Sequence, residues 1–249
     1  MNDRESRPRD SAQQHRIAVD IASAAVTVAD LSIGRDAVYR RLGYKGQKKP
    51  KPAIASVLGD VLPEALEMLQ PSFWCKAVDI ERIRRPRVTL SDGVRIVLAS
   101  DVLCRALAPC QQAVCFVCSI GSRLEGEVAA LMGRGETLRA SILDAIGSEA
   151  TERVADYVEA KVKREAESVG AGVTLRYSPG YCDWDITQQR KLFKIFEPDD
   201  IGVSLTEECL MIPQKSVSGI VGVGWGDRRL IGMSPCRHCE KKGDCEHRR

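Results

Sequence analysis

The chain has 249 residues, with 37 Lys and Arg against 34 Asp and Glu, so its net charge is only +3. This balance argues against a protein that binds nucleic acid through bulk positive charge. No stretch reaches about 18 uninterrupted apolar residues, so we expect no membrane span, and the polar start MNDRESRPRD shows no signal peptide. Ten cysteines without a secretory signal favour a reducing cytoplasm over a disulfide framework.

The N-terminal third predicts an arm followed by helices. Residues 1–16 are almost entirely polar, which is typical of a disordered arm. Residues 17–33 are Ala-rich and predict a partly helical segment, and a short helix over 35–42 is closed by Gly43. The basic run of residues 40–51 predicts a solvated loop, with an acidic partner as the alternative. Residues 53–69 have helical apolar spacing.

The middle of the chain predicts strands. Residues 76–98 alternate as strands with a turn at Gly93, and residues 113–120 form an apolar run of strand length that is buried on both faces. Cys115 and Cys118 spell a CxxC, but residues three apart on a strand point to opposite faces and cannot share one metal. We therefore expect core thiols there, and likewise at Cys75, Cys104, Cys110 and Cys209.

The sequence after residue 121 again predicts helices. We expect helices over 122–133 and 137–146, and a further helix that Ser148 caps and Gly170 ends, with Glu159 and Lys163 paired on its outside. Residues 173–176 predict a strand. Asp185 and Gln188 resemble a capping box for a helix that reaches residue 196.

Two late strands, SLTEECLM and VSGIVGVG, complete the pattern, with a turn at Pro213 between them. Short connections between helices and strands indicate one α+β domain over residues 17–233, followed by a Cys-rich tail over 234–249.

One predicted turn of the chain could bind a ligand. In RYSPGYCDWD, residues 176–185, Arg176 can hold a carboxylate and Tyr181 can face a cation, while Gly180 permits close backbone approach to a ligand or a turn with positive φ. The alternative is a tight turn with a surface arginine. The P-loop, HExxH and GxSxG motifs are absent. The three histidines lie only at 15, 238 and 247, which excludes a catalytic serine or cysteine with a histidine base inside the core.

Two motifs together resemble a known family. The R-x-x-x-G-Y turn at 176–181 is followed by L-T-E at 205–207, Met211, Pro213 and S-x-S-G at 216–219, as in the activation (reactivation) domain of cobalamin-dependent methionine synthase. RDAVYRRLGYKG and the stretch from Cys118 to Val158 are similar to short, stand-alone members of that family. The resemblance covers roughly residues 30–233 and implies a twisted, mainly antiparallel central sheet with flanking helices.

The resemblance implies a ligand and a chemistry. The family binds S-adenosylmethionine and passes its methyl group to a corrinoid whose cobalt an electron donor has reduced. By position, Arg176 would hold the ligand's carboxylate, the backbone of Ser178 and Gly180 would line it, and Tyr181 would flank the sulfonium. Matching family positions in the late strands are Glu207, Ser216, Ser218 and Gly219, of which Ser216 to Gly219 would shape the face that meets the corrinoid.

The chain departs from the large enzymes of the family in two ways. A tyrosine pair that follows their S-x-S-G strand is replaced here by GWGDRRLIG. The DxHxxG motif, the zinc cysteines and room for a folate barrel are also missing, so the corrinoid would sit on a separate methionine synthase or related methyltransferase. These departures leave two alternatives open, a non-catalytic subunit that docks on a corrinoid protein and a metal-tail redox protein that binds no S-adenosylmethionine.

The tail predicts a metal site. Cys236, Cys239 and Cys245 form C-x2-C-x5-C, a spacing that lets thiolates share one metal. With His247 they could hold zinc, and with a further cysteine such as Cys182 they could hold an iron–sulfur cluster. Neighbouring Lys and Arg side chains would favour the thiolates. A tail of metal-free thiols is the alternative.

Overall fold

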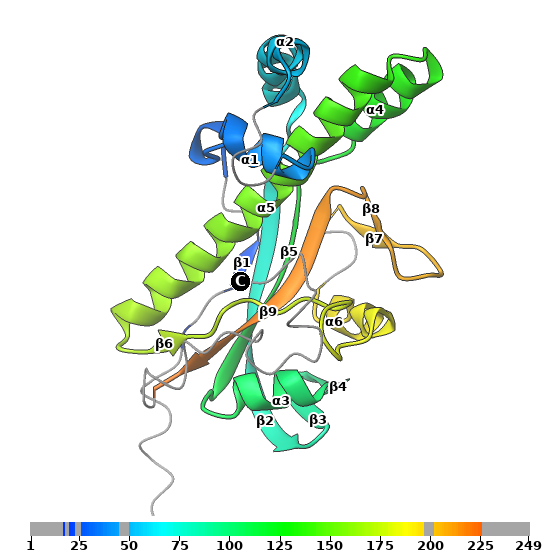
Figure 1. Ribbon diagram of the computed structural model, residues 1–249. Coiled ribbons are helices and arrows are strands. Elements are labelled where there is room, and N and C mark those ends of the chain that lie inside the picture. Colours follow the sequence, from blue (N-terminus) through cyan, green and yellow to red (C-terminus); the bar gives the residue numbers. More distant parts are fainter. Residues whose placement is uncertain (1–16, 18–19, 23–25, 45–49, 197–201, 226–249) are drawn as a thin grey trace, which may run out of the picture.

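The computed structural model describes residues 17, 20–22, 26–44, 50–196 and 202–225, which contain one seven-stranded sheet (Figure 1). Its strand order is β4-β3-β2-β5-β9-β6, and β1 also pairs with β2. The described pairings are antiparallel, which confirms the α+β class with an antiparallel sheet. The strands are β1 Asp20–Ala22, β2 Ser72–Arg84, β3 Arg87–Asp92, β4 Val94–Ala99, β5 Gln112–Ser119, β6 Gly172–Val173 and β9 Ser216–Gly224, with a separate hairpin of β7 Ser204–Leu205 and β8 Met211–Ile212.

Helices cover both faces of this sheet. The long helix α5 runs along one face, with α1, α2 and α4 gathered around its N-terminal half, whereas α3 and α6 lie at the other face (Figure 1). None of the helices in the described ranges is long and apolar enough to cross a membrane. The helices are α1 Arg35–Arg41, α2 Pro52–Met68, α3 Asp101–Leu107, α4 Arg123–Gly133, α5 Thr137–Ser168 and α6 Gln189–Phe193, with 3₁₀ turns η1 Val28–Asp30 and η2 Ile186–Gln188.

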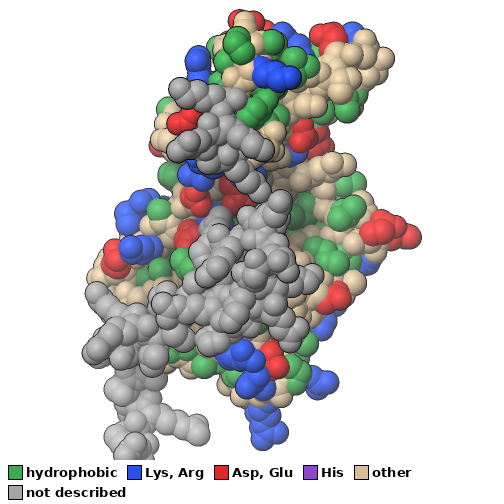
Figure 2. Space-filling view, in the orientation of Figure 1, with side chains coloured by type: hydrophobic (Ala, Val, Ile, Leu, Met, Phe, Trp, Pro, Cys, Tyr) green, Lys and Arg blue, Asp and Glu red, His purple; other side chains and the backbone are tan. Residues whose placement is uncertain are grey.

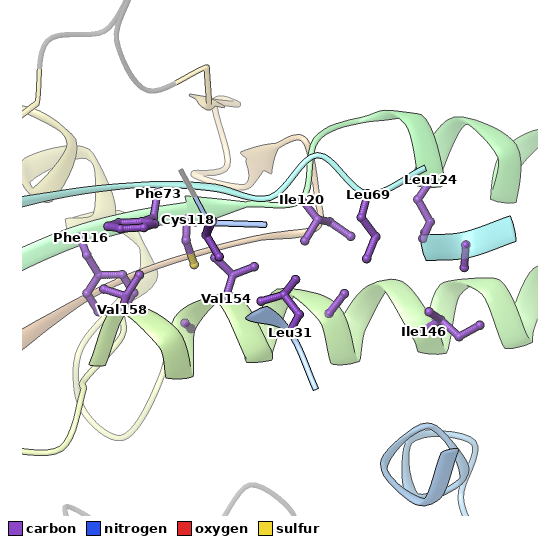
Figure 3. Packing of buried hydrophobic residues seen from close by; sticks show 14 of the residues in the cluster. Leu31, Leu69, Phe73, Phe116, Cys118, Ile120, Leu124, Ile146, Val154 and Val158 are labelled. Carbon is purple, nitrogen blue, oxygen red and sulfur yellow. The ribbon is translucent and has the colours of Figure 1, made fainter. Parts of the chain in front are cut away.

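The central strand β5 separates two hydrophobic cores. Every residue of β5 is buried, as the apolar run predicts. Cys118 belongs to the core under α5, where Figure 3 shows it near Phe73 and Val154, whereas Cys115 belongs to the core beside α3. The two thiols point to opposite faces, so the prediction that this CxxC cannot share a metal is confirmed.

The other core cysteines are also where the sequence predicts them. Cys75, Cys104, Cys110 and Cys209 are buried, whereas Cys182 is exposed. Burial raises the pKa of Cys118 and of Cys110 to about 12, and it also raises the pKa of Cys75, with the nearby Cys118 as a smaller cause. These thiols therefore stay protonated near neutral pH and behave as small apolar side chains.

The N-terminal prediction is partly wrong. Asp20–Ala22 forms β1 and pairs with Trp74–Lys76 of β2, and among the described residues of 17–33 only the 3₁₀ turn η1 is helical. An apolar, Ala-rich run can serve either structure, and here an unpaired edge of β2 accepts it. The arm 1–16 and residues 45–49 of the basic run lie outside the described residues.

The predicted helix break at Ser148 is also wrong. Residues 137–168 form one helix, and Ser148 lies inside it, where its Oγ accepts a hydrogen bond from Lys215 Nζ at 2.9 Å. Gly147 is needed for packing, because a Cβ there would lie 2.6 Å from Leu124 Cδ2 of α4. The glycine thus admits a neighbouring side chain without ending the helix, whereas Gly170, at φ +74°, follows its end as predicted.

The prediction for the first late strand is wrong, and one helix earlier in the chain was not predicted. The segment SLTEECLM forms no single strand but contributes β7 and the start of β8 to a short hairpin. The sequence reading also missed α3, whose N-cap Ser100 accepts a hydrogen bond from Leu103 N. Ser100 followed by Asp101 and an apolar run is an N-terminal helix signal that could have found it.

Candidate functional site

The candidate turn joins the sheet through Tyr177. Its N–H donates to Ile220 O at 2.9 Å, and Ile220 N donates to Tyr177 O at 2.8 Å, so the chain beyond β6 stays beside β9. Gly180 has φ +91° and its N–H donates to Trp184 O at 2.7 Å, which closes the turn. A positive φ explains the glycine, as the sequence predicts. Tyr181, next along the chain, is 51% exposed.

Gly219 brings the two family motifs together. A Cβ at this position would lie 2.6 Å from Tyr177 O and 2.8 Å from the Phe116 ring. Only glycine therefore lets the RYSPGY segment approach the SVSG strand this closely. The structure thus places residues 176–181 and 216–219, which lie far apart in the sequence, side by side.

Arg176 is buried among three carboxylates of α5. Its Nη1 donates to Asp156 Oδ1 at 2.6 Å and to Glu159 Oε2 at 2.7 Å, and its Nη2 donates to Glu152 Oε2 at 2.7 Å. Burial opposes the charge of Arg176, but the hydrogen bonds and charges of these carboxylates outweigh it and raise its pKa. The predicted outer pair of Glu159 with Lys163 is replaced, since Glu159 turns to Arg176 and Lys163 lies 3.9 Å from Glu167.

A guanidinium has five N–H donors, and three are used by these bonds. Nε–H and one N–H of Nη2 make no hydrogen bond to a residue that the structure describes. The network also extends along α5 through two further arginines, because Arg153 and Arg41 both pair with the buried Glu149 and Arg153 reaches Asp156. Four carboxylates and three guanidiniums of the described residues thus meet in one network.

The serines of the S-x-S-G motif are buried and hydrogen-bonded within the chain. Ser216 Oγ donates to Pro213 O at 2.7 Å and lies 2.9 Å from Ser119 Oγ. Ser218 Oγ donates to Gln189 Oε1 at 2.9 Å, and Gln189 Nε2 donates to Cys209 O at 2.8 Å. These hydroxyls tie β9 to α6 and to the hairpin of β7 and β8.

That hairpin carries Glu207, whose side chain is exposed and whose carbonyl accepts a hydrogen bond from Arg190. The hairpin also exposes Leu210 by 59% and Ile212 by 50%. The Glu207 carboxylate is therefore on a projecting surface and lies outside the hydrogen bonds that hold Arg176.

Some residues that hold the turn were missed in the sequence. Asp183 accepts hydrogen bonds from Ser100 Oγ and Asp101 N, both at 2.6 Å, so it binds the N-terminus of α3. The predicted capping box is half correct, since Asp185 accepts from Thr187 N at 2.8 Å while Gln188 bonds instead to the backbone of Ala99.

The carboxylates around Arg176 were also missed. Glu152, Asp156 and Glu159 recur at helical spacing, a signal in the sequence that could have found them. Their partner lies on a distant segment, so the spacing alone does not identify it.

The predicted metal cysteines Cys236, Cys239 and Cys245 lie outside the described residues, as does His247. Within the part of the chain that is described, no group of three His, Cys, Asp or Glu side chains could hold a metal ion. The tail site therefore stays a prediction.

Comparison with known proteins identifies the family. The family model of the vitamin B12 dependent methionine synthase activation domain matches residues 91–224, more than half of the chain. The crystal structure of the MetH reactivation domain bound to AdoHcy has a similar fold, with a TM-score of 0.62 and 14% identity over 83% of this chain and 79% of that one. No curated protein matches the sequence. The chain therefore belongs to the family of the vitamin B12 dependent methionine synthase activation domain.

Proposed function

We propose that this protein supports the reductive methylation of a corrinoid that is bound to a separate cobalamin-dependent methionine synthase or related methyltransferase. An external electron donor reduces the cobalt from Co(II) to Co(I). The cobalt then takes the methyl group of S-adenosylmethionine and leaves S-adenosylhomocysteine. The work of this chain is to hold the methyl donor and to present it to the corrinoid protein.

The observation that carries the proposal is the Arg176 cluster beside the turn. An amino acid headgroup has a carboxylate for Arg176 and an ammonium for the acidic side chains of α5. S-adenosylmethionine adds a sulfonium and carries a net charge of +1, which suits a site that acidic side chains border. A bidentate contact to the remaining donors of Arg176 is the expected form of carboxylate binding.

The turn supplies the rest of the ligand site. The backbone of Ser178 and Gly180 lines the ligand, and the half-exposed Tyr181 flanks the sulfonium through the negative face of its ring. The similar MetH reactivation domain was solved with AdoHcy, the product of such a methyl transfer, which supports this assignment.

The late strands form the corrinoid-facing side. Because Ser216 and Ser218 are engaged within the chain, we assign them the role of fixing the hairpin and strand edge. The exposed Leu210 and Ile212 and the carboxylate of Glu207 then meet the corrinoid protein. Buried thiols without disulfides among the described residues are in keeping with the cytoplasm as the place of this reaction.

One observation favours the second candidate, a docking subunit that binds no S-adenosylmethionine. The side chain of Arg176 is only 5% exposed, and three carboxylates already satisfy its charge. Such a network can serve the fold alone. The absence of a tyrosine pair after Gly219 points the same way.

Calorimetric titration with S-adenosylmethionine separates the two candidates. We expect the wild-type protein to bind it, Arg176→Gln to lose binding, and Arg153→Gln to keep it, because Arg153 shares the acidic helix but does not come from the turn. Tyr181→Ala should weaken binding without unfolding, because its ring is exposed.

An anaerobic reaction with a reduced corrinoid protein then tests transfer, with methyl–cobalt absorbance as the readout. Failure to bind S-adenosylmethionine, together with retained binding of the corrinoid protein, would establish the docking subunit instead. Failure of both would contradict both candidates. Iron, sulfide and zinc analysis of anaerobically purified protein tests the tail site at Cys236, Cys239 and Cys245 separately.

A further inference from the structure

The end of the sheet that β3, β4 and the C-terminal part of β2 form has one face that no described helix or strand covers. In β3, Val88 and Leu90 are buried against the core beside α3, so Arg87, Thr89 and Ser91 point to the opposite side. In β4, Ile96 and Leu98 are buried and their neighbours are turned outward in the same way. The exposed side chains of this arginine face are Arg82, Arg84, Arg87, Arg95 and Val97, with the half-buried Thr89 between them.

A β-bulge decides that the arginines of β2 belong to this face. The register between β2 and β3 shifts between Ile80 and Arg82, so Glu81 is an extra residue. Without it, Arg82 would share the face of Ile80 and point into the core. With it, Ile83 packs inward, while Arg82 pairs with Thr89 and Arg84 pairs with Arg87 on the outside.

Within the described residues, the charge of this face is only partly compensated, because Glu81 is the acidic side chain that acts on Arg95 and Arg82. Arg95 pairs with Glu81, but Arg82, Arg84 and Arg87 form no hydrogen bond or ion pair with any described residue. Figure 2 shows Lys and Arg side chains, with acidic side chains among them, at the lower end of the molecule, around α3 and the connection between β2 and β3. Two of the three lie directly opposite each other across β2 and β3, where like charges repel. The fold therefore bears a cost that a negatively charged partner would remove.

We propose that the arginine face is a docking surface for the acidic surface of a partner protein. Arginine is enriched in protein interfaces because its guanidinium binds carboxylates bidentately and its stem adds apolar contact. Thr89 and the 37% exposed Val97 place a small, partly apolar centre among the charges. Charged rims around such a centre guide association and select the partner by charge.

A protein fits this face better than nucleic acid. Sheets that bind single strands stack bases on aromatic side chains, and the described positions of this face carry none. The overall charge of +3 also lacks the excess that binding to phosphate backbones uses.

The arginine face is linked to the candidate turn through the connection between β2 and β3. Arg85, in this tight connection, donates to Asp101 at 2.9 Å. Asp101 is the first residue of α3, and its own N–H donates to Asp183 of the turn. Because Trp184 of the turn packs in the core on the other side of the sheet, a partner on the arginine face would lie across the sheet from the turn, and the docking requires neither S-adenosylmethionine nor a corrinoid.

The test uses the full chain and a fluorescent oligo-glutamate peptide as the probe, with binding measured by anisotropy at increasing NaCl. We expect binding that weakens with salt. The variant Arg82→Glu, Arg84→Glu, Arg87→Glu should weaken it by roughly tenfold or more, since three favourable charge contacts become repulsive. The matched control Arg123→Glu, Lys163→Glu, Arg164→Glu makes the same change of net charge on exposed helix positions and should keep binding within about twofold.

Three further measurements complete the test. Thermal melting verifies that both variants fold, and glutamine replacements of the same three arginines serve if the glutamates prevent folding. Equal loss in the two variants would overturn the proposal, because it would indicate bulk charge alone. Tighter binding of a DNA duplex or of phosphatidylglycerol vesicles than of the peptide, or no binding of the peptide, would overturn it as well.

Discussion

The Arg176 cluster makes the most informative prediction, because it joins the fold to the candidate ligand site. Replacing Arg176 with Gln removes three charge-assisted hydrogen bonds, of 2.6 to 2.7 Å, between the turn and α5. Glu152, Asp156 and Glu159 then lose the guanidinium that they share, while Asp156 keeps its ion pair with Arg153.

The magnitude follows from the burial of the partners. Removing one partner of a buried ion pair costs about 3–5 kcal/mol, because the remaining charge is left without compensation. Here the carboxylates are 29%, 36% and 19% exposed, so water can solvate them in part. We therefore expect a loss of about 3 kcal/mol in the free energy of unfolding, at the lower end of that range. For a domain of this size, this lowers the melting temperature by roughly 6–12 °C.

Urea denaturation followed by circular dichroism measures this loss, and Arg85→Gln is the matched control. Arg85 also pairs with an aspartate, but its side chain is 55% exposed and its partner Asp101 is 42% exposed. Water screens such an exposed pair, so it contributes little and the control should unfold almost like the wild type. Neutralising the three carboxylates together with Arg176 should recover part of the stability, because the cost comes from unpaired charge.

The reasoning would be refuted by a variant Arg176→Gln that loses no more stability than the control. In that case the carboxylates are already well hydrated, and the network does not hold the turn against α5. A stable variant that nevertheless loses S-adenosylmethionine binding would separate the two roles of Arg176 and leave only the ligand role.

Further predictions follow from the turn and the core. Gly219→Ala places a Cβ against Tyr177 O and the adjacent ring and should cost about 1–3 kcal/mol in urea denaturation, and an unchanged midpoint would contradict that close approach. Asp183→Ala removes acceptors at the N-terminus of α3 and should cost about 1–2 kcal/mol, with faster amide exchange in α3 as the check. In the native protein, iodoacetamide should label the exposed Cys182 and spare Cys118, whose pKa is raised to about 12. Above about pH 9 the unfolded thiol of Cys118 ionises while the folded one keeps its proton, so the free energy of unfolding should fall by about 1.4 kcal/mol per pH unit for this thiol, and a flat profile up to pH 11 would exclude that cause.

The sequence predicts those parts of the fold in which local pattern and burial agree. The β5 segment is a nearly continuous apolar run of strand length, which predicted a strand buried on both faces, and the alternation of a strand already placed Cys115 and Cys118 apart. The α5 segment was predicted as two helices with a break before Ser148, whereas the structure has one helix in which Gly147 leaves room for Leu124 of α4. Such a contact leaves no mark in the local pattern.

The candidate site also has features that the sequence predicts and features that only the tertiary structure decides. Its family motifs and the positive φ of Gly180 follow from the sequence, since a turn of this kind requires residues with these conformational preferences. The partners of Arg176 and the outward direction of Arg82 depend on the tertiary structure, because α5 is packed against the turn and a single extra residue in β2 reverses the faces of the strand. Local sequence determines backbone conformation and burial tendency, whereas only the packing of distant segments decides which charges are paired and which remain available to a ligand or a partner.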